Sequence, residues 1–343
     1  MGRGRAVRLT WRAVAAAVVV ALVGGALWLH ALVSAPRPTD RATQLFTVAT
    51  GDTATDVGTL LARQGLIQSG WLFSAWSRVN HLESHLRAGV YVLSPSMSLA
   101  QVMAVLSQGD ILVHRVTIPG GLTVQATVAR LVAGHVATRA ALDRALKEGL
   151  PGLSLPPSLQ GVRDPLEGFL YPDTYSFPAG TPARQVVLTM WADFRARTAS
   201  LRGQLAADHL TLWRWVTLAS IVQAEYGYAP DAPKIAAVFD NRLAQGMRLQ
   251  SDATVRYALG HPVTGGLTLA DLTVASPYNT YVTPGLPPGP IDAPGLVALR
   301  AVLHPAHVPY LYFVAMPDGR SLFATTYAEH LKNVARVQAM EKP

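Results

Sequence analysis

Glu225 is the residue of this sequence with the clearest potential for acid chemistry. It stands late in the apolar run LASIVQAE, where Leu218, Val222 and Glu225 share one helical face at spacings of i, i+4 and i+7. Burial on such a face raises the pKa of a carboxyl group, because desolvation disfavours the anion. A carboxylic acid of raised pKa can protonate a poor leaving group such as a glycosidic oxygen. The alternative is a solvated glutamate near a helix end, and this pattern alone leaves both open.

Other common catalytic motifs are missing from the sequence. It contains no G-x-x-x-x-G-K-[ST] loop, no G-x-S-x-G elbow, no H-E-x-x-H motif and no cysteine. His304 and His307 flank Pro305 in a turn-like context, so we expect neither a metal site nor a cofactor. Carboxylates instead occur near aromatic, amide and glycine residues, a composition that suits carbohydrate chemistry. These acidic residues are Glu167, Asp173, Glu225, Asp240 and Asp252.

The charge distribution argues against nucleic-acid binding. The formal net charge is +8, but the five arginines before Asp40 account for most of it and residues 40–343 carry only +3. No run of lysine and arginine and no basic stripe with interleaved aromatic residues stands out there. We therefore expect no nucleic-acid partner, although a mild positive charge favours contact with an anionic polymer or membrane surface.

The N-terminal segment predicts a membrane anchor. Four arginines precede a stretch without charge that begins at Ala13, and the apolar character continues to Val33. This length spans a bilayer, and arginines before the span place the N-terminus in the cytoplasm. The alternative is a cleaved signal peptide, but Ser34-Ala35-Pro36 is a poor cleavage site. The prediction is a cytoplasmic segment 1–12, a transmembrane helix 13–33, a tether 34–43 and an extracytoplasmic remainder.

Residues 44–119 predict a small subdomain of the LysM type. Strand patterns at 45–48 and 88–93 enclose two helical patterns, at 56–63 and from Ser69 onward. A helix that begins after Ser98 and a strand at 114–118 follow. Gly51-Asp52-Thr53 resembles the start of a LysM unit, which binds polymers of N-acetylglucosamine. A spacer without sugar affinity is the equally weighted alternative.

Residues 120–343 predict a mixed α/β domain that would carry the active site. Helical patterns occur at 123–150, 182–198, 213–226, 233–244, 294–303 and 327–340. Residues 310–315 read as a strand that can pair with 323–324, and 278–294 read as an extended segment rich in glycine and proline. The predicted fold class is α+β: a transmembrane helix, a LysM-like βααβ subdomain, and a catalytic domain with a single-glutamate groove.

Five sequence blocks, in this order, are similar to the MltG (YceG-like) endolytic murein transglycosylase family. They are LEGFLYPDTYSF, LASIVQAE, VFDNRLAQGMRLQSDATVRYALG, SPYNTYVTPGLPPGPI and HPAHVPYLYFVA. The resemblance covers about residues 44–340. It implies one N-terminal anchor, a LysM-like region and a catalytic domain that cuts nascent peptidoglycan strands internally. It also implies partnership with peptidoglycan synthases such as penicillin-binding proteins.

The resemblance assigns the catalytic acid to the block around Glu225. Many members of the family have two acids there, as Glu-x-Glu, whereas this sequence has Gln223 and Glu225. Glutamine cannot donate a proton as a carboxylic acid does, so the departure indicates Glu225. Lytic transglycosylases need one acid, which protonates the glycosidic oxygen between N-acetylmuramic acid and N-acetylglucosamine. The resulting carboxylate then accepts the proton of the muramoyl C6 hydroxyl. The products have 1,6-anhydromuramoyl ends, and a second carboxylate is not required.

Substrate-binding roles are expected for residues around the matching blocks. Each candidate also has a structural interpretation, such as a capping carboxylate in a turn, Asp252 as the N-cap of a helix at 253–259, or packing of the extended loop. The candidates are Glu167, Asp173, Gln250, Asp252, Tyr278, Asn279, Thr280 and Tyr281. Two other functions remain open at this point: a muramidase that hydrolyses the same bond, and a non-catalytic glycan-binding scaffold for wall synthases.

Overall fold

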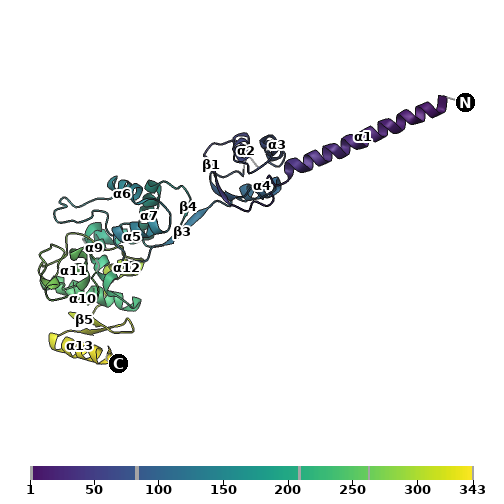
Figure 1. The fold of residues 1–343 in the computed structure, drawn as a ribbon. Coiled ribbons are helices and arrows are strands. Elements are labelled where there is room, and N and C mark those ends of the chain that lie inside the picture. Colours follow the sequence, from purple (N-terminus) through teal and green to yellow (C-terminus); the bar gives the residue numbers. More distant parts are fainter. Residues whose placement is uncertain (1–2, 82–84, 208–209, 262, 342–343) are drawn as a thin grey trace. The chain divides into compact units, whose positions relative to one another are not determined.

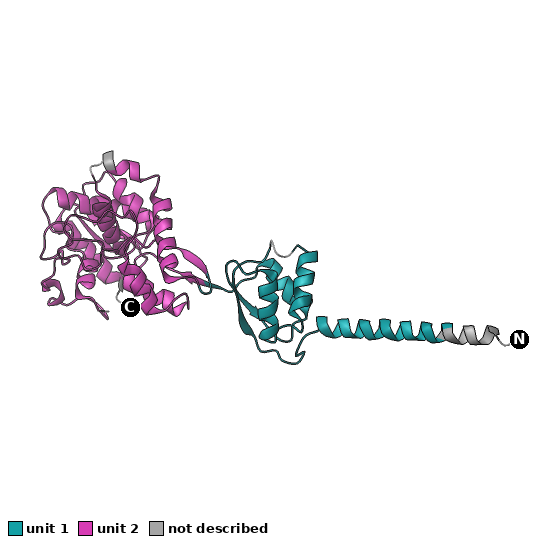
Figure 2. Cartoon of the chain, turned by 90° about the horizontal axis from the view of Figure 1, so that it is seen from above, with its two compact units in different colours: residues 1–114, 178–180 teal, residues 115–177, 181–343 magenta. Residues whose placement is uncertain are grey.

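The computed structural model describes residues 3–81, 85–207, 210–261 and 263–341, which form helices and short strands (Figure 1). The chain divides into two compact units, one of residues 1–114 with 178–180 and one of residues 115–177 with 181–343 (Figure 2). Over the described ranges, the strands form three two-stranded sheets. The predicted mixture of helices and strands is therefore confirmed.

The first element is a long N-terminal helix, α1 (Arg3–Val33). Among the described residues, Ala13–Val33 is the one helical stretch long and apolar enough to cross a membrane, by length and composition. The predicted apolar segment 13–33 is thus a helix in the structure. Which side of a membrane each end faces remains a prediction.

The rest of the first unit follows the predicted strand–helix–helix–strand order. β1 (Gln44–Val48) pairs antiparallel with β2 (Gly89–Leu93), and between them lie α2 (Ala54–Arg63) and α3 (Gly70–Val79). α4 (Leu99–Gln108) follows. The predicted caps are present: the hydroxyl groups of Ser69 and Ser98 accept hydrogen bonds from backbone N–H groups in the first turns of α3 and α4.

Two glycines allow α2 and α3 to pack closely. A Cβ atom on Gly58 would lie 2.7 Å from the backbone oxygen of Gly70, so a larger residue would force the helices apart. The core beneath them contains fully buried aromatic rings from both strands and α3: Phe46, Phe73 and Tyr91.

The second unit contains most of the helices and the two remaining sheets. Its elements are β3 (Val113–Thr117), α5 (Val124–Ala133), α6 (Arg139–Lys147), β4 (Thr174–Pro178), α7 (Ala183–Thr198), α8 (Arg202–Ala207), α9 (Leu212–Glu225), α10 (Ala232–Ala244), α11 (Asp252–Leu259), α12 (Leu296–Leu303), β5 (Tyr312–Ala315), β6 (Ser321–Ala324) and α13 (Tyr327–Glu341). Short 3₁₀ turns lie at Ala229–Asp231 and Asp271–Thr273. β3 pairs with β4, a strand that the sequence patterns did not indicate.

α9 is buried through most of its length, which explains why its sequence is apolar on every face. It packs against α10 and α12. The Trp215 indole donates to the Leu299 backbone oxygen at 2.9 Å, and the Ser220 hydroxyl accepts from the Ile291 backbone N–H at 3.0 Å. These contacts fix the rotation and the end point of the helix that carries Glu225.

The C-terminal elements form a hairpin and a helix beside α10. β5 pairs antiparallel with β6, and α13 packs on both strands. Two side chains of α10 hold the segment that leads into β5. The Asn241 amide donates to the backbone oxygens of Val308 and Tyr310, and the Arg242 guanidinium donates to that of Leu311.

Candidate active site

Glu225 is the last residue of α9, and its side chain is half-buried. The chain turns to an extended conformation at Tyr226, so the carboxyl group lies at the end of a buried helix. Burial raises the pKa of Glu225, and the neighbouring Asp252 carboxylate acts in the same direction. A position at a helix C-terminus also disfavours a negative charge, because the helix dipole is negative there. The predicted acid of raised pKa is therefore present.

Three groups can hold the Glu225 carboxylate once it has lost its proton. The Ser251 hydroxyl donates to Oε1 at 2.5 Å, and the Ala253 backbone N–H also donates to the carboxyl group. The positive charge of Arg242 acts from nearby. All three lower the pKa of Glu225, but burial outweighs them. The site thus favours a protonated acid and still offers hydrogen bonds to its conjugate base.

The turn before α11 brings Ser251 to Glu225. Gln250 has a left-handed backbone conformation with φ of 51°, and its N–H donates to the Thr280 backbone oxygen at 3.1 Å. The Ser251 N–H donates to the Thr280 hydroxyl at 3.0 Å. Thr280 is buried, and its hydroxyl also pairs with that of Thr254 at 2.8 Å. Thr280 therefore acts by holding the turn rather than by facing solvent.

Arg242 is a fixed, buried cation beside this turn. Its side chain is 8% exposed, and it donates to the backbone oxygens of Leu249 at 2.7 Å and Leu311 at 2.6 Å. Its guanidinium carbon lies 5.1 Å from the centre of the Tyr312 ring. Within the described residues, no carboxylate lies within salt-bridge distance of Arg242. Its charge is therefore available to a carboxylate formed at Glu225.

Tyr281 and Asp252 form a second polar pair near Glu225. The Tyr281 hydroxyl donates to Asp252 Oδ1 at 2.6 Å. Burial and the Asp252 carboxylate raise the pKa of Tyr281, so the hydroxyl remains a donor. Asp252 is exposed and is the first residue of α11, whereas the N-cap is Ser251, one residue before the predicted one. Of the predicted binding residues, Asp252 and Tyr281 lie close enough to interact electrostatically with Glu225, and Gln250 belongs to the turn that carries Ser251.

Three other predicted binding residues use their polar groups within the protein. The Asn279 amide donates to the Leu272 and Val274 backbone oxygens, and the Tyr278 hydroxyl accepts from the Arg163 N–H at 3.3 Å. Both side chains are buried. Asp173 forms an ion pair with Arg197 at 2.6 Å. These contacts favour the structural interpretation of Tyr278, Asn279 and Asp173, and their contact with substrate remains a prediction.

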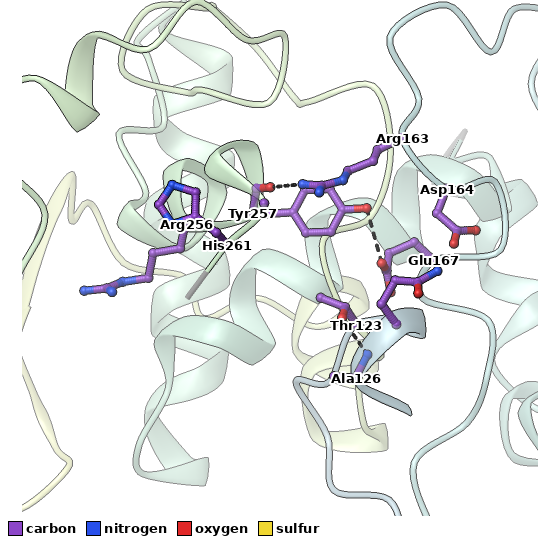
Figure 3. Close-up of a pocket in the computed structure, with 10 residues that line it drawn as sticks. Thr123, Ala126, Arg163, Asp164, Glu167, Arg256, Tyr257 and His261 are labelled. Carbon is purple, nitrogen blue, oxygen red and sulfur yellow. Dashed lines mark hydrogen bonds between the residues drawn. The ribbon is translucent and has the colours of Figure 1, made fainter. Parts of the chain in front are cut away.

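Glu167 lies at a second site, toward the other end of α11. It is 2% exposed, accepts a hydrogen bond from the Val124 N–H at 2.8 Å and another from the Tyr257 hydroxyl at 3.2 Å. Burial raises its pKa to about 8. Glu167 lines a cavity of about 660 Å³ together with Arg163 and Asp164 (Figure 3). Glu225 does not line this cavity, so the two acids belong to separate places.

Comparison with known proteins decides the family. The model of the YceG-like family matches residues 46–336. The chain belongs to the YceG-like family. It is 30% identical over 313 residues to an endolytic murein transglycosylase of Streptococcus pneumoniae serotype 2. The matched region covers 83% of this chain and 56% of that relative. The chain thus spans little more than half the length of this relative.

Two further matches cover nearly whole proteins. An endolytic murein transglycosylase of Bacillus subtilis is 28% identical over 324 residues, which make up 91% of this chain and 89% of that protein. The crystal structure of a yceG-like protein of Listeria monocytogenes matches with a TM-score of 0.58 and 33% identity, over 85% of this chain and 99% of that one. The predicted resemblance is therefore confirmed.

In this YceG-like chain, Gln223 has a structural place. Its side-chain oxygen accepts a hydrogen bond from the Gly295 N–H at 2.8 Å and one from the Tyr226 hydroxyl at 3.3 Å. Gly295 is the N-cap residue of α12, so the Gln223 amide joins the end of α9 to the start of α12. Its contacts differ from those of Glu225, which meets the turn before α11.

Sequence patterns missed Ser251 and Arg242 as partners of Glu225. Ser251 stands at the N-cap of α11, yet its hydroxyl makes no capping hydrogen bond and turns to Glu225 instead. A serine before a helix normally indicates a cap, so nothing local distinguishes this one.

Among the described residues, no group of three or more His, Asp or Glu side chains is arranged to hold a metal ion.

Proposed function

We propose that this YceG-like chain is an endolytic lytic transglycosylase with Glu225 as its acid and base. It cleaves the β-1,4 bond between MurNAc and GlcNAc in nascent peptidoglycan strands, leaves 1,6-anhydroMurNAc ends and so terminates glycan elongation. The names of the relatives support this activity. The observation that carries the proposal is the Glu225 carboxyl group, whose pKa is raised by burial at the end of α9 and whose Oε1 accepts a hydrogen bond from Ser251.

The reaction needs one proton donor that recovers its proton. The Glu225 acid gives its proton to the glycosidic oxygen while the bond from that oxygen to muramoyl C1 breaks. The muramoyl C6 oxygen then forms a bond to C1, and its hydroxyl proton passes to the Glu225 carboxylate. The glycan leaves as two shorter strands, water is not consumed, and the enzyme returns to its starting state.

The surroundings of Glu225 support both halves of this cycle. Burial and the Asp252 carboxylate favour the protonated form that starts the reaction. Ser251, the Ala253 N–H and Arg242 stabilise the carboxylate that must accept the second proton. Because these groups are held by Thr280 and by backbone oxygens, they need little rearrangement during turnover.

A muramidase that hydrolyses the same bond remains the second candidate. Hydrolysis uses a second carboxylate, either to activate water or to form a covalent intermediate. The sequence showed no tightly spaced partner for Glu225, but the structure places Asp252 near enough to affect the pKa of Glu225. Asp252 is exposed and bound by Tyr281, so it is the residue that would serve a hydrolase.

Analysis of the glycan ends tests the proposal. Purified full-length protein is incubated with nascent, uncrosslinked glycan, and the products are examined by mass spectrometry. Anhydromuramoyl ends support the transglycosylase, reducing ends support the muramidase, and binding without cleavage supports a scaffold. Glu225→Gln should lower cleavage about 10³-fold. Glu148→Gln, at an ion pair with Arg184 on the surface, is a matched control that should cleave normally.

We also propose that Ala13–Val33 anchors the chain in the bacterial inner membrane with its N-terminus in the cytoplasm. The arginines before this segment and its apolar length support the assignment. The chain has no cysteine, so single cysteines can report topology. A membrane-impermeant maleimide should label Thr43→Cys in intact spheroplasts and leave Gly4→Cys unlabelled. The reverse pattern would contradict this orientation.

Residues 44–119 are proposed to bind glycan as a LysM-like subdomain. The order β1, α2, α3, β2 supports this proposal. Removal of residues 44–111, which leaves β3 and its pairing with β4 in place, from the Glu225→Gln protein should reduce its retention on insoluble peptidoglycan. Equal retention would favour the spacer interpretation. Peptidoglycan synthases are proposed partners by family resemblance, which co-purification from detergent-solubilised membranes can test.

A further inference from the structure

The cavity at the end of α11 has the features of a ligand-binding site. Its volume is about 660 Å³, within the range of small-ligand pockets. It is formed by the start of α5, the loop that contains Arg163 and Asp164, and the last turn of α11 (Figure 3). None of the proposed reaction chemistry at Glu225 uses these side chains, so the cavity needs an explanation of its own.

Arg163 is held in a fixed position at this cavity. Its guanidinium donates to the Tyr257 backbone oxygen at 2.5 Å and lies 5.3 Å from the centre of the Tyr257 ring. Its backbone N–H donates to the Tyr278 hydroxyl at 3.3 Å. A guanidinium has five N–H donors, and this arrangement uses one of them. Within the described ranges, the other guanidinium N–H groups have no protein acceptor.

Gly260 makes room for this arrangement. It ends α11 in the left-handed conformation, with φ of 74°. A Cβ atom at this position would overlap the Arg163 guanidinium. A side chain here would therefore displace Arg163 from its place on the Tyr257 ring.

The charges around the cavity favour an anion. Neither Arg163 nor Arg256, which also lines it, has a carboxylate within salt-bridge distance in the described part of the chain. Glu167 lies deeper, is nearly inaccessible, and has a pKa raised to about 8 by burial, so it carries little charge at neutral pH. Asp164 accepts a hydrogen bond from the Leu166 N–H at 2.9 Å. Arg256 donates to the backbone oxygens of Val263 and Gly265. With Arg163 and Arg256 set against Asp164, the lining keeps a small positive balance, and Arg163 is the cation beside Glu167.

We propose that this cavity binds a carboxylate of the peptide stem carried by the glycan, with Arg163 as the main recognition residue. The inference rests on the proposed function, because that function supplies a glycan whose muramoyl units bear peptides. The planar guanidinium matches a carboxylate with two parallel hydrogen bonds. The cavity would then select strands that still carry their peptides, while Glu225 performs the cleavage elsewhere.

Binding without turnover tests the subsite directly. The full-length Glu225→Gln protein in detergent is titrated with three ligands: the disaccharide with its peptide, the same ligand with an amidated peptide terminus, and the disaccharide without peptide. The protein should prefer the free carboxylate over both other ligands. Adding Arg163→Gln should reduce that preference about tenfold, since a charge-assisted hydrogen bond is lost.

Two further variants keep the test decisive. Arg214→Gln, an exposed arginine on α9 outside the cavity, should retain the preference. Arg163→Lys keeps the positive charge but loses the planar pair of N–H donors, so it should reduce the preference less than Arg163→Gln does. If Arg163→Gln does not fold by circular dichroism, a reduction in Arg163→Lys supports the subsite and an unchanged preference overturns it.

Failure of the carboxylate subsite can be distinguished from failure of the proposed transglycosylase function. Equal binding of the free and amidated termini, or an unchanged preference in Arg163→Gln, overturns the carboxylate subsite and leaves the transglycosylase proposal standing. Conversely, wild-type protein that produces no anhydromuramoyl ends overturns the proposed function and does not alter the measured preference.

Discussion

Glu225 and Glu167 both have raised pKa values, and each contacts one end of α11. The residues at its start, Ser251 and Ala253, bind Glu225, and Tyr257 in its last turn binds Glu167. Burial is the main cause of both pKa shifts. Glu225 is half-buried at a helix end, whereas Glu167 is 2% exposed with both oxygens bound. A raised pKa therefore indicates burial, and access to substrate separates a catalytic acid from a structural one.

Exchange of each acid for its amide gives the largest expected difference. Glu225→Gln should lower kcat about 10³-fold, because the amide cannot donate the proton, and should leave the melting temperature nearly unchanged. Glu167→Gln should lower kcat far less, since its contacts are internal. Cleavage of uncrosslinked glycan and thermal unfolding measure the two effects. A comparable loss of kcat in both variants would break the distinction between the acids.

Removal of the Glu167 side chain should instead reduce stability. Glu167→Ala leaves the Val124 N–H and the Tyr257 hydroxyl without their buried partner, which should cost about 2 to 4 kcal/mol of unfolding free energy. Denaturant unfolding of the full chain measures the change, with Glu167→Gln as the milder control. An unfolding midpoint like that of the wild type would show that these hydrogen bonds do not hold α5 and α11 together.

Ser251→Ala should lower kcat about tenfold with little change in KM, because one donor to the Glu225 carboxylate is lost. That hydrogen bond lowers the pKa of Glu225, so its loss should raise the pKa further. The alkaline limb of the kcat profile, where the acid loses its proton, should move to higher pH. The exposed Ser200→Ala is the control. A shift to lower pH would contradict the assigned role.

The pH dependence of stability should also distinguish the acids. The folded-state pKa of Glu167, about 8, lies above its ordinary value of 4.5. Its contribution is therefore fully present below pH 4.5 and is lost as pH rises toward 8, with a slope of at most about 1.4 kcal/mol per pH unit. Burial also raises the pKa of Asp292, so its contribution to the free energy of unfolding likewise decreases as pH rises. Glu167→Gln should flatten the decline, which urea unfolding at several pH values can measure.

Tyr281→Phe is expected to have the smallest effect. It removes a hydrogen bond to the exposed Asp252 and leaves Ser251 and Arg242 in contact with the Glu225 site. We expect a decrease in kcat of about twofold or less, as for other solvent-exposed charged contacts. A loss as large as that of Ser251→Ala would indicate that Asp252 takes part in the reaction and would favour the hydrolase.

Local sequence patterns predicted the parts of the molecule that depend on local physics. The apolar faces of α9 and the serine caps of α3 and α4 follow from periodicity and from hydrogen bonding within one turn. Periodicity also placed Glu225 on an apolar face, but its selection as the catalytic acid came from the family resemblance and remains a prediction.

Contacts between distant segments were not predictable in the same way. β4 pairs with β3 across more than fifty residues, and the Ser251 hydroxyl turns to Glu225 although its position suggests a cap. Asn279 and Tyr278 looked suitable for sugars, but their polar groups bind the backbone. Which partner a side chain meets depends on packing of the whole second unit, and one sequence does not encode this locally.

The origin of the oxygen at the new glycan ends tests the central claim most directly. Cleavage of uncrosslinked glycan by the full-length protein in water enriched with heavy oxygen should give muramoyl ends without the heavy isotope, one water lighter than a reducing end. Glu225→Gln should give no new ends. Heavy oxygen at C1 of the new muramoyl ends would contradict the account, because it would show that water, rather than the C6 hydroxyl, attacks the bond.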